Sequence, residues 1–130
     1  MDTVAGPTIL LVEDDDDTRE SVAELLKDRG YCVVAKRDGA EAEAYLAAGP
    51  LPDCILLDLW MPVSDGWAFA AGLQRAGLAR IPVVVLTAAE PQWGYPAGVR
   101  HILRKPVGPE ALLALISDAL RKDAGAGPPA

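Results

Sequence analysis

The sequence predicts an α/β fold in which a parallel sheet carries helices on both faces. Five short apolar runs alternate along the 130 residues with segments of helical periodicity. The runs are rich in Val and Ile, which is typical of strands that are buried on both faces. This alternation of strand and helix indicates a single domain built around one parallel sheet.

The first half of the chain contains two predicted strand–helix pairs. Residues 8–12 (TILLV) and 31–35 (YCVVA) are continuous apolar runs and are predicted as strands. Residues 18–29 place their apolar side chains on one face of a helix, and Gly30 is a natural C-terminal stop for that helix. Residues 39–48 are predicted as the second helix.

The second half continues the alternation. Residues 54–57 (CILL) and 81–86 (IPVVVL) are predicted strands, and a helix is predicted between them over residues 66–76. Residues 99–103 (VRHIL) form a weaker apolar run, which is the fifth predicted strand. Residues 109–121 have the clearest helical periodicity, and they begin with a proline, which is favoured in the first turn of a helix.

Composition and charge limit the classes of partner. The formal net charge is −7, so a nucleic-acid duplex or an anionic membrane would repel the chain, and neither is expected as a direct partner. No apolar run reaches the ~18–20 residues of a membrane span, and the N-terminus does not resemble a signal peptide. A cytoplasmic location is therefore expected, with Cys32 and Cys54 reduced and buried. The folded domain is expected to span residues 8–122, with flexible termini at 1–7 and 123–130.

Polar residues that can carry chemistry follow four of the predicted strands. Glu13 and Asp14 follow the first strand, Asp58 the third, Thr87 the fourth and Lys105 the fifth. Taken singly, an acidic residue before a helix is usually a cap, and a polar residue at a strand end is usually a turn or surface residue. Ligands of such sheets bind at the carboxyl ends of the strands. The five residues together therefore predict one site with three carboxylates, a hydroxyl and an ammonium group.

Such a site suits a divalent cation and a phosphoryl group. Two carboxylates about 5 Å apart repel each other by about 3 kcal/mol at an effective dielectric constant near 20. Mg²⁺ removes this repulsion, because it binds one or two carboxylates and accepts a phosphate oxygen as a further ligand. Lys105 can pair with one phosphoryl oxygen and Thr87 can donate a hydrogen bond to another. Asp58 is then the attacking carboxylate, which would form an acyl phosphate.

Four motifs resemble those of response-regulator receiver domains, the phosphoacceptor domains of two-component signalling that are typified by the chemotaxis regulators. The motifs are ILLVED (9–14), ILLDLWMPVSDG (55–66), VLTA (85–88) and RKP (104–106). The first resembles the family's strand with its acidic pair, the second its phosphoacceptor motif, and the last two its Thr and Lys-Pro motifs. The resemblance covers residues 8–121, and the order and spacing of the motifs also fit.

This resemblance implies a flavodoxin-like fold, with a doubly wound five-stranded parallel sheet of order 2-1-3-4-5. It implies that Asp58 is phosphorylated, with Thr87 and Lys105 completing the catalytic set. The donor would be the phosphohistidine of a sensor histidine kinase or of a histidine phosphotransfer protein. The implied Mg²⁺ ligands are Asp14, Asp58, the backbone carbonyl of Trp60 and, through water, Glu13.

Under the same resemblance, phosphorylation switches the interaction with a downstream protein partner. The domain would slowly hydrolyse its own phosphoryl group, but it would not be a dedicated enzyme.

Two departures from the family concern how the signal leaves the domain. Ile102 stands where the family usually has Tyr or Phe as a switch aromatic. The stretch between Thr87 and the Lys-Pro motif is shorter than usual and contains two prolines and two glycines within residues 91–98, which predicts a shortened or irregular fourth helix. The expected switch region is therefore Thr87, Ile102, Trp93 and Tyr95.

Two other functions remain as alternatives. The first is a pseudo-receiver, a constitutive docking module that no longer switches; the altered segment and Ile102 favour it, and the complete catalytic set opposes it. The second is an enzyme such as a phosphatase with an aspartyl nucleophile. Such enzymes typically need a second Asp two residues after the first, where this chain has Trp60. A dinucleotide-binding site is excluded, because the first strand is followed by EDDDD and not by a Gly-rich turn.

Overall fold

The computed structural model describes residues 6–59, 68–69, 71–73, 75–78, 80–87, 101–104 and 108–125. Within them, five strands form one parallel sheet of order β2-β1-β3-β4-β5. The strands are β1 (Thr8–Val12), β2 (Cys32–Lys36), β3 (Cys54–Leu59), β4 (Val83–Thr87) and β5 (His101–Arg104). The predicted parallel sheet and its strand order are therefore confirmed, and each strand lies within two residues of its predicted bounds.

Three helices have defined bounds: α1 (Asp16–Asp28), α2 (Gly39–Ala48) and α4 (Pro109–Gly125). α1 begins two residues before its predicted start, because Asp15 caps it; Asp15 Oδ2 accepts a hydrogen bond of 2.8 Å from the backbone N–H of Thr18. The chain leaves α1 through Gly30, whose φ of 94° suits glycine, as predicted. α4 continues four residues past its predicted end at 121, and its last three residues lie in the segment for which composition predicts a flexible tail.

The remaining helix predictions are tested in part. Residues 68–69, 71–73 and 75 are helical, which agrees with the predicted helix over 66–76. The predicted shortened or irregular helix between β4 and β5 falls on residues 88–100, which lie outside the described residues. Among the helices that the structure describes, none has the length and apolar character that a membrane span requires.

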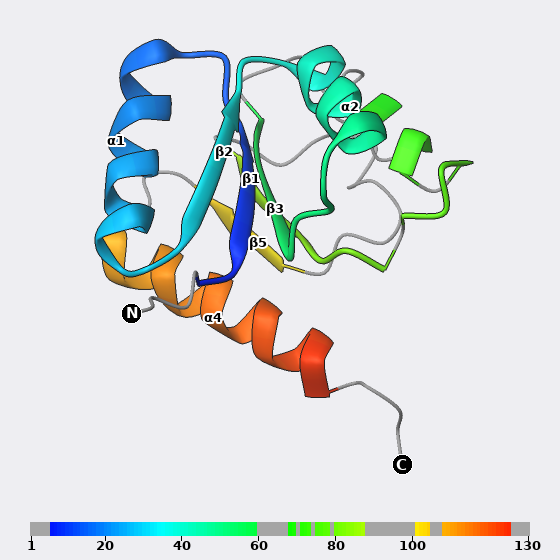
Figure 1. The fold of residues 1–130 in the computed structure, drawn as a ribbon. Helices are drawn as coiled ribbons and strands as arrows, with labels where there is room; N and C mark the ends of the chain where they lie inside the picture. The colour runs from blue at the N-terminus through cyan, green and yellow to red at the C-terminus, as the bar shows by residue number, and fades with distance from the viewer. Residues whose placement is uncertain are drawn as a thin grey trace, which may run out of the picture.

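Helices cover both faces of the sheet (Figure 1). Successive residues of β1 point to opposite faces, so Ile9 and Leu11 pack with α1 and α4, whereas Leu10 and Val12 pack with α2 and Phe69. Each side of the sheet thus has its own apolar cluster. This is the doubly wound arrangement that the resemblance implies.

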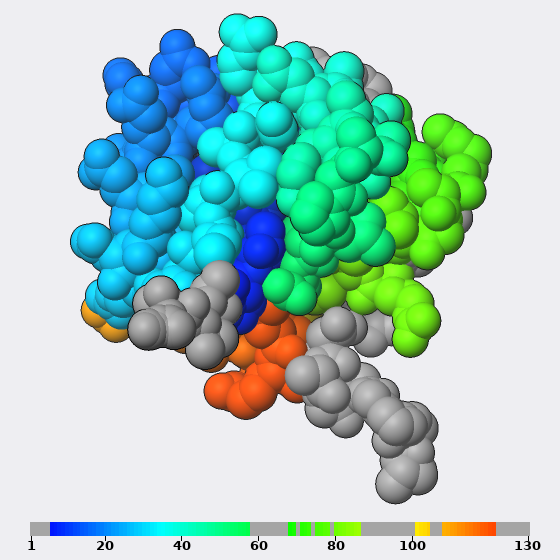
Figure 2. Space-filling model, in the orientation of Figure 1, coloured from blue at the N-terminus to red at the C-terminus, as the bar shows by residue number. Residues whose placement is uncertain are grey.

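The two edge strands are less buried than the three central ones. The apolar residues of β1 and β3 are at most 1% exposed from Ile9 to Val12 and from Cys54 to Leu57, whereas the residues of β2 are only partly buried or exposed. Figure 2 shows the side chains of the β2 region at the surface, between α1 and α2. Burial on both faces was therefore the wrong prediction for β2 and for β5, because an edge strand has a neighbour on one side only. For the same reason Cys32 is only half-buried, while Cys54 is buried.

Candidate functional site

The strand register brings three of the predicted site positions, Glu13, Asp58 and Thr87, to one edge of the sheet. Val12, the last residue of β1, lies opposite Leu57 of β3. Glu13 and Asp58 are each one residue further, so they follow at the same level on neighbouring strands, whose spacing is about 4.8 Å. On the next pair of strands, Thr87 lies opposite Leu59 on one side and Arg104 on the other. The carboxyl ends of β1, β3, β4 and β5 therefore meet where the sequence predicts the site.

Glu13 is the residue whose environment is most unusual. It is fully buried, at 0% exposure, and it is the one charged residue among the described side chains that is buried. Its Oε2 accepts a hydrogen bond of 2.9 Å from the backbone N–H of Asp15. Its own backbone N–H donates to the carbonyl of Lys36 at 3.0 Å, which ties the end of β1 to the end of β2. The position of Glu13 is thus fixed by its main chain and by its side chain.

Asp14 follows Glu13 and is exposed at the same edge. Its backbone is held between two constrained neighbours, since Asp15 is the N-cap of α1 and Glu13 is bonded as above. Carboxylate oxygens of this kind are ligands that Mg²⁺ prefers, so the donor chemistry of the Glu13–Asp14 pair fits the implied ion. No group of three His, Cys, Asp or Glu side chains that could hold a metal occurs among the side chains that the structure describes. The side chain of Asp58, the third predicted carboxylate, is not among them.

The other predicted residues are placed unevenly. The backbone of Thr87 ends β4, but its side chain is not described. Trp60, Lys105, Trp93 and Tyr95 lie outside the described residues. Ile102 lies opposite Val85 on β5, is partly buried, and packs against the apolar cluster on the α2 side of the sheet. The expected role of position 102 in the switch region stays a prediction.

Lys36, the last residue of β2, and Arg37, which follows it, interact with α2. Lys36 Nζ lies 5.9 Å from the centre of the Tyr45 ring. Arg37 contacts Glu41 three times: its backbone N–H donates to Oε1 at 3.0 Å, and its Nε and Nη2 donate to Oε2 at 3.4 and 3.3 Å. The backbone hydrogen bond from Arg37, together with the charge of its guanidinium, lowers the pKa of the Glu41 carboxyl. Both cations are therefore engaged with side chains of α2.

Sequence reasoning missed Arg19. Its Nη1 donates to the backbone carbonyl of Glu13 at 3.0 Å, and its Nη2 donates to Asp16. The available signal was an arginine six residues after Glu13, on the first turns of a predicted helix. Helical periodicity places such a residue on an exposed face, whereas its side chain is only 17% exposed.

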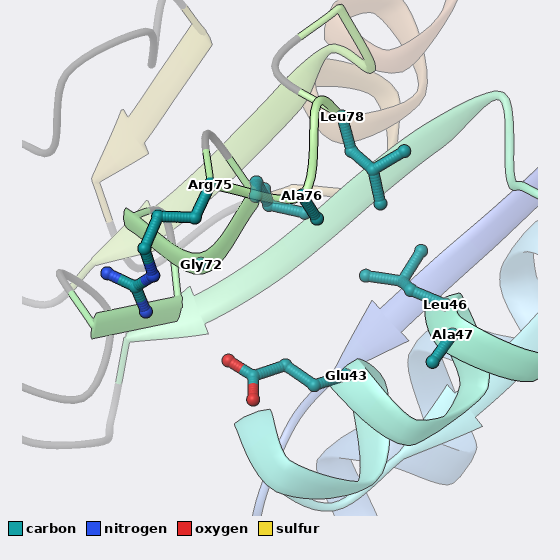
Figure 3. A pocket seen from close by; sticks show the side chains of 8 residues that line it. Glu43, Leu46, Ala47, Gly72, Arg75, Ala76 and Leu78 are labelled. Atoms are coloured by element: carbon teal, nitrogen blue, oxygen red, sulfur yellow. The ribbon is translucent and has the colours of Figure 1, made fainter.

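A cleft of about 380 Å³ lies between α2 and the facing helical segment (Figure 3). The residues that line it are Glu43, Leu46, Ala47, Gly72, Leu73, Arg75, Ala76 and Leu78. Figure 3 shows Glu43 and Arg75 on opposite sides of the cleft, which is otherwise largely apolar. None of the predicted site residues is among the described residues that line it.

Comparison with known proteins gives consistent matches. Residues 9–117 match the model of the response regulator receiver domain family. The response regulator MprA of Mycolicibacterium vanbaalenii is 40% identical over 126 residues, which cover 92% of this chain and 54% of that protein. MprA of Mycobacterium leprae is 39% identical over 118 residues, which cover 88% of this chain and 51% of that protein. The chain thus spans about half the length of these relatives.

Solved structures agree with the sequence matches. The chemotaxis response regulator CheY4 of Vibrio cholerae superposes with a TM-score of 0.77 at 28% identity, over 88% of this chain and 98% of that one. The signal receiver domain of a signal transduction histidine kinase from Syntrophus aciditrophicus has the same TM-score at 28% identity, over 89% of this chain and 91% of that one. The sheet order, the acidic pair at its edge and these similarities together show that the chain belongs to the response regulator receiver domains of two-component systems.

Proposed function

We propose that this receiver domain accepts a phosphoryl group on Asp58 in a Mg²⁺-dependent reaction, and that the modification switches its binding to another protein. The observation that carries the proposal is the strand register. It puts the backbone of Asp58 on the strand next to β1, at the level of the buried Glu13 and beside the exposed Asp14. A nucleophilic carboxylate beside an acidic pair is the arrangement that a hard cation and a phosphoryl group both suit.

In the proposed reaction Asp58 is the nucleophile, and the acidic pair helps to bind Mg²⁺. A carboxylate oxygen of Asp58 attacks the phosphorus of a phosphohistidine, the phosphorus–nitrogen bond of the donor breaks, and an acyl phosphate forms on Asp58. Asp14, Asp58 and the backbone carbonyl of Trp60 would bind Mg²⁺, with Glu13 acting through water. When bound, the ion neutralises the charge that gathers on the transferring group.

Two further residues complete the proposed catalytic set. Thr87 would donate a hydrogen bond to one phosphoryl oxygen, and Lys105 would pair with another as a point charge. The position of Thr87 supports this role, since its backbone lies one strand away from β3 and opposite Leu59, which directly follows Asp58.

The proposed partners are proteins. The phosphoryl donor would be a sensor histidine kinase or a histidine phosphotransfer protein, and the output would be a downstream protein. The net charge of −7 argues against direct binding of this domain to nucleic acid. The domain would hydrolyse its own phosphoryl group slowly, and we do not propose a dedicated enzymatic activity for it.

Output is proposed to pass through residues 91–98. Ile102 packs in the apolar cluster and offers neither a ring nor a hydroxyl for a rotamer switch. The neighbouring stretch carries Trp93 and Tyr95, and such aromatics are common anchors in protein interfaces. Phosphorylation would convert the singly charged Asp58 carboxylate into an acyl phosphate that carries roughly −1.5 to −2 of charge.

Beryllofluoride, which mimics a phosphoryl group on a carboxylate, separates this function from that of a constitutive docking module. Amide hydrogen exchange is measured on the wild type and on Asp58→Asn, with Mg²⁺ and with or without beryllofluoride. The proposal expects slower exchange at the carboxyl edge of the sheet and in residues 91–98, in the wild type only. Identical exchange of the wild type in both conditions would favour the docking module.

A further inference from the structure

Arg19 is a cation next to a site that is proposed to bind a second cation. It belongs to the first turns of α1, whose N-terminal end carries partial positive charge from the helix dipole. It also lies next to the acidic pair that is proposed to bind a cation, where another cation weakens the attraction for the ion. Its position therefore calls for an explanation in its hydrogen bonds.

The hydrogen bonds of Arg19 reach residues that precede and follow Asp14 in the sequence. Nη1 of Arg19 donates to the backbone carbonyl of Glu13 at 3.0 Å, and Nη2 donates to the carboxylate of Asp16. The side chain of Arg19 is only 17% exposed, while that of Asp16 is 76% exposed, so the guanidinium is turned toward the protein. Its planar fork of donors suits two acceptors in fixed positions.

The carbonyl that Arg19 binds is part of the peptide unit between Glu13 and Asp14. A peptide unit is planar, so fixing its oxygen also fixes the direction of the N–H of Asp14 and the position of its Cα. Other hydrogen bonds of this loop come from the backbone N–H groups of Glu13 and Asp15 and from the cap at Asp15. The hydrogen bond from Arg19 therefore acts directly on the peptide plane of Asp14.

We propose that Arg19 is a positioning residue for the Mg²⁺ site: it fixes the peptide unit that precedes Asp14, and so aims the Asp14 carboxylate at the ion. This inference rests on the proposed function of the acidic pair. Partners that orient a metal ligand typically change metal affinity 10- to 100-fold when they are removed.

Removal of Arg19 distinguishes a positioning role from a purely electrostatic one, because the two roles predict opposite changes in the affinity for Mg²⁺. If the guanidinium acts only as a charge, Arg19→Gln makes the site more negative and tightens Mg²⁺ binding. If it positions Asp14, the same change weakens Mg²⁺ binding, by about tenfold. Arg19→Lys keeps the charge but loses the fork of donors, so positioning predicts an intermediate loss of affinity.

Mg²⁺ titration calorimetry on the full chain measures this directly. The matched control is Arg121→Gln, which removes an arginine of the same kind, paired three residues back with Asp118 on α4 at 3.4 Å. Urea unfolding in EDTA reports the stability of each variant without the ion. The expected result is that Kd for Mg²⁺ rises in Arg19→Gln, rises less in Arg19→Lys, and stays at the wild-type value in Arg121→Gln.

Each other outcome overturns a defined claim. An unchanged or lower Kd in Arg19→Gln, or an equal rise in Arg121→Gln, overturns the role of Arg19 while leaving the proposed function in place. If Arg19→Gln does not fold by circular dichroism, Arg19→Lys decides, and a wild-type Kd in that variant overturns the inference. A wild-type protein that does not bind Mg²⁺ overturns the proposed function itself.

Discussion

Replacing Asp58 by Asn should stabilise the protein when Mg²⁺ is absent. Glu13 is fully buried and Asp58 lies at the same level on the neighbouring strand, so two carboxylates share one edge of the sheet, and Asp14 directly follows Glu13. Asn has nearly the shape of Asp but no charge. The substitution therefore removes repulsion while keeping the packing.

The size of the effect follows from the strand geometry. With neighbouring strands about 4.8 Å apart, two unit charges repel by about 3 kcal/mol at an effective dielectric constant near 20. Asp14 is exposed, so water screens its share of the repulsion. Since solvent relaxes part of the Glu13–Asp58 repulsion as well, we expect Asp58→Asn to raise the free energy of unfolding by about 2 kcal/mol, or Tm by about 8 °C.

Mg²⁺ should reverse this advantage. At a concentration about 100 times its Kd, the ion stabilises the protein that binds it by about 2.7 kcal/mol. The wild type should gain this stabilisation, and Asp58→Asn should gain much less. In urea unfolding, Asp58→Asn should therefore be more stable than the wild type in EDTA. In saturating Mg²⁺ the wild type should be the more stable of the two.

Asp53→Asn is the matched control, because Asp53 directly precedes β3, at the opposite end of the strand from the site. Its Oδ2 accepts a hydrogen bond from the backbone N–H of Thr8 at 2.8 Å, and the amide oxygen of Asn can accept the same bond. This variant should stay within about 0.5 kcal/mol of the wild type in both conditions. The reasoning is refuted if Asp58→Asn is less stable than the wild type in EDTA, or if Mg²⁺ stabilises both proteins equally.

Three further predictions concern the cap of α1, the Arg37–Glu41 pair and the proposed output segment. Asp15→Ala should lower the free energy of unfolding by about 1 kcal/mol, because the bond to the N–H of Thr18 is lost, whereas Asp15→Asn should keep most of it in urea unfolding. The lowered pKa of Glu41 means that its contribution to stability is present above the ordinary value of 4.5 and is lost as pH falls through the folded pKa; NMR titration of Arg37→Gln should show that pKa rising toward 4.5, with part of the shift kept by the backbone bond. Beryllofluoride should change the fluorescence of Trp93 in a variant that keeps only this tryptophan, and unchanged emission would count against output through residues 91–98.

Much of the fold could be predicted because the signals for it are local. The Val- and Ile-rich runs identify the strands, and Gly30 and Pro109 mark helix ends through their backbone preferences alone. The errors have physical causes. α1 was predicted to start too late because the periodicity begins at its apolar face, whereas the helix begins at the cap residue Asp15. Equal burial of all five strands was predicted because composition does not tell an edge strand from a central one.

Part of the site could likewise be predicted from the sequence, and part could not. The positions of Glu13, Asp14, Asp58 and Thr87 at one sheet edge follow from strand order and register, which the alternation of elements already implies. The complete burial of Glu13 and its bonds to its neighbours could not be predicted, since they depend on how the loop after β1 packs. Arg19 was missed for a related reason. Its partner is a backbone carbonyl, and because every residue has one, the residue types do not show which carbonyl accepts a hydrogen bond.

The most direct test of the central claim is the intact mass of the protein after incubation with acetyl phosphate. We expect one phosphoryl adduct on the wild type in the presence of Mg²⁺. No adduct should form in excess EDTA or on Asp58→Asn. An adduct that survives Asp58→Asn, or one that forms equally in EDTA, would contradict a Mg²⁺-dependent phosphorylation site at Asp58.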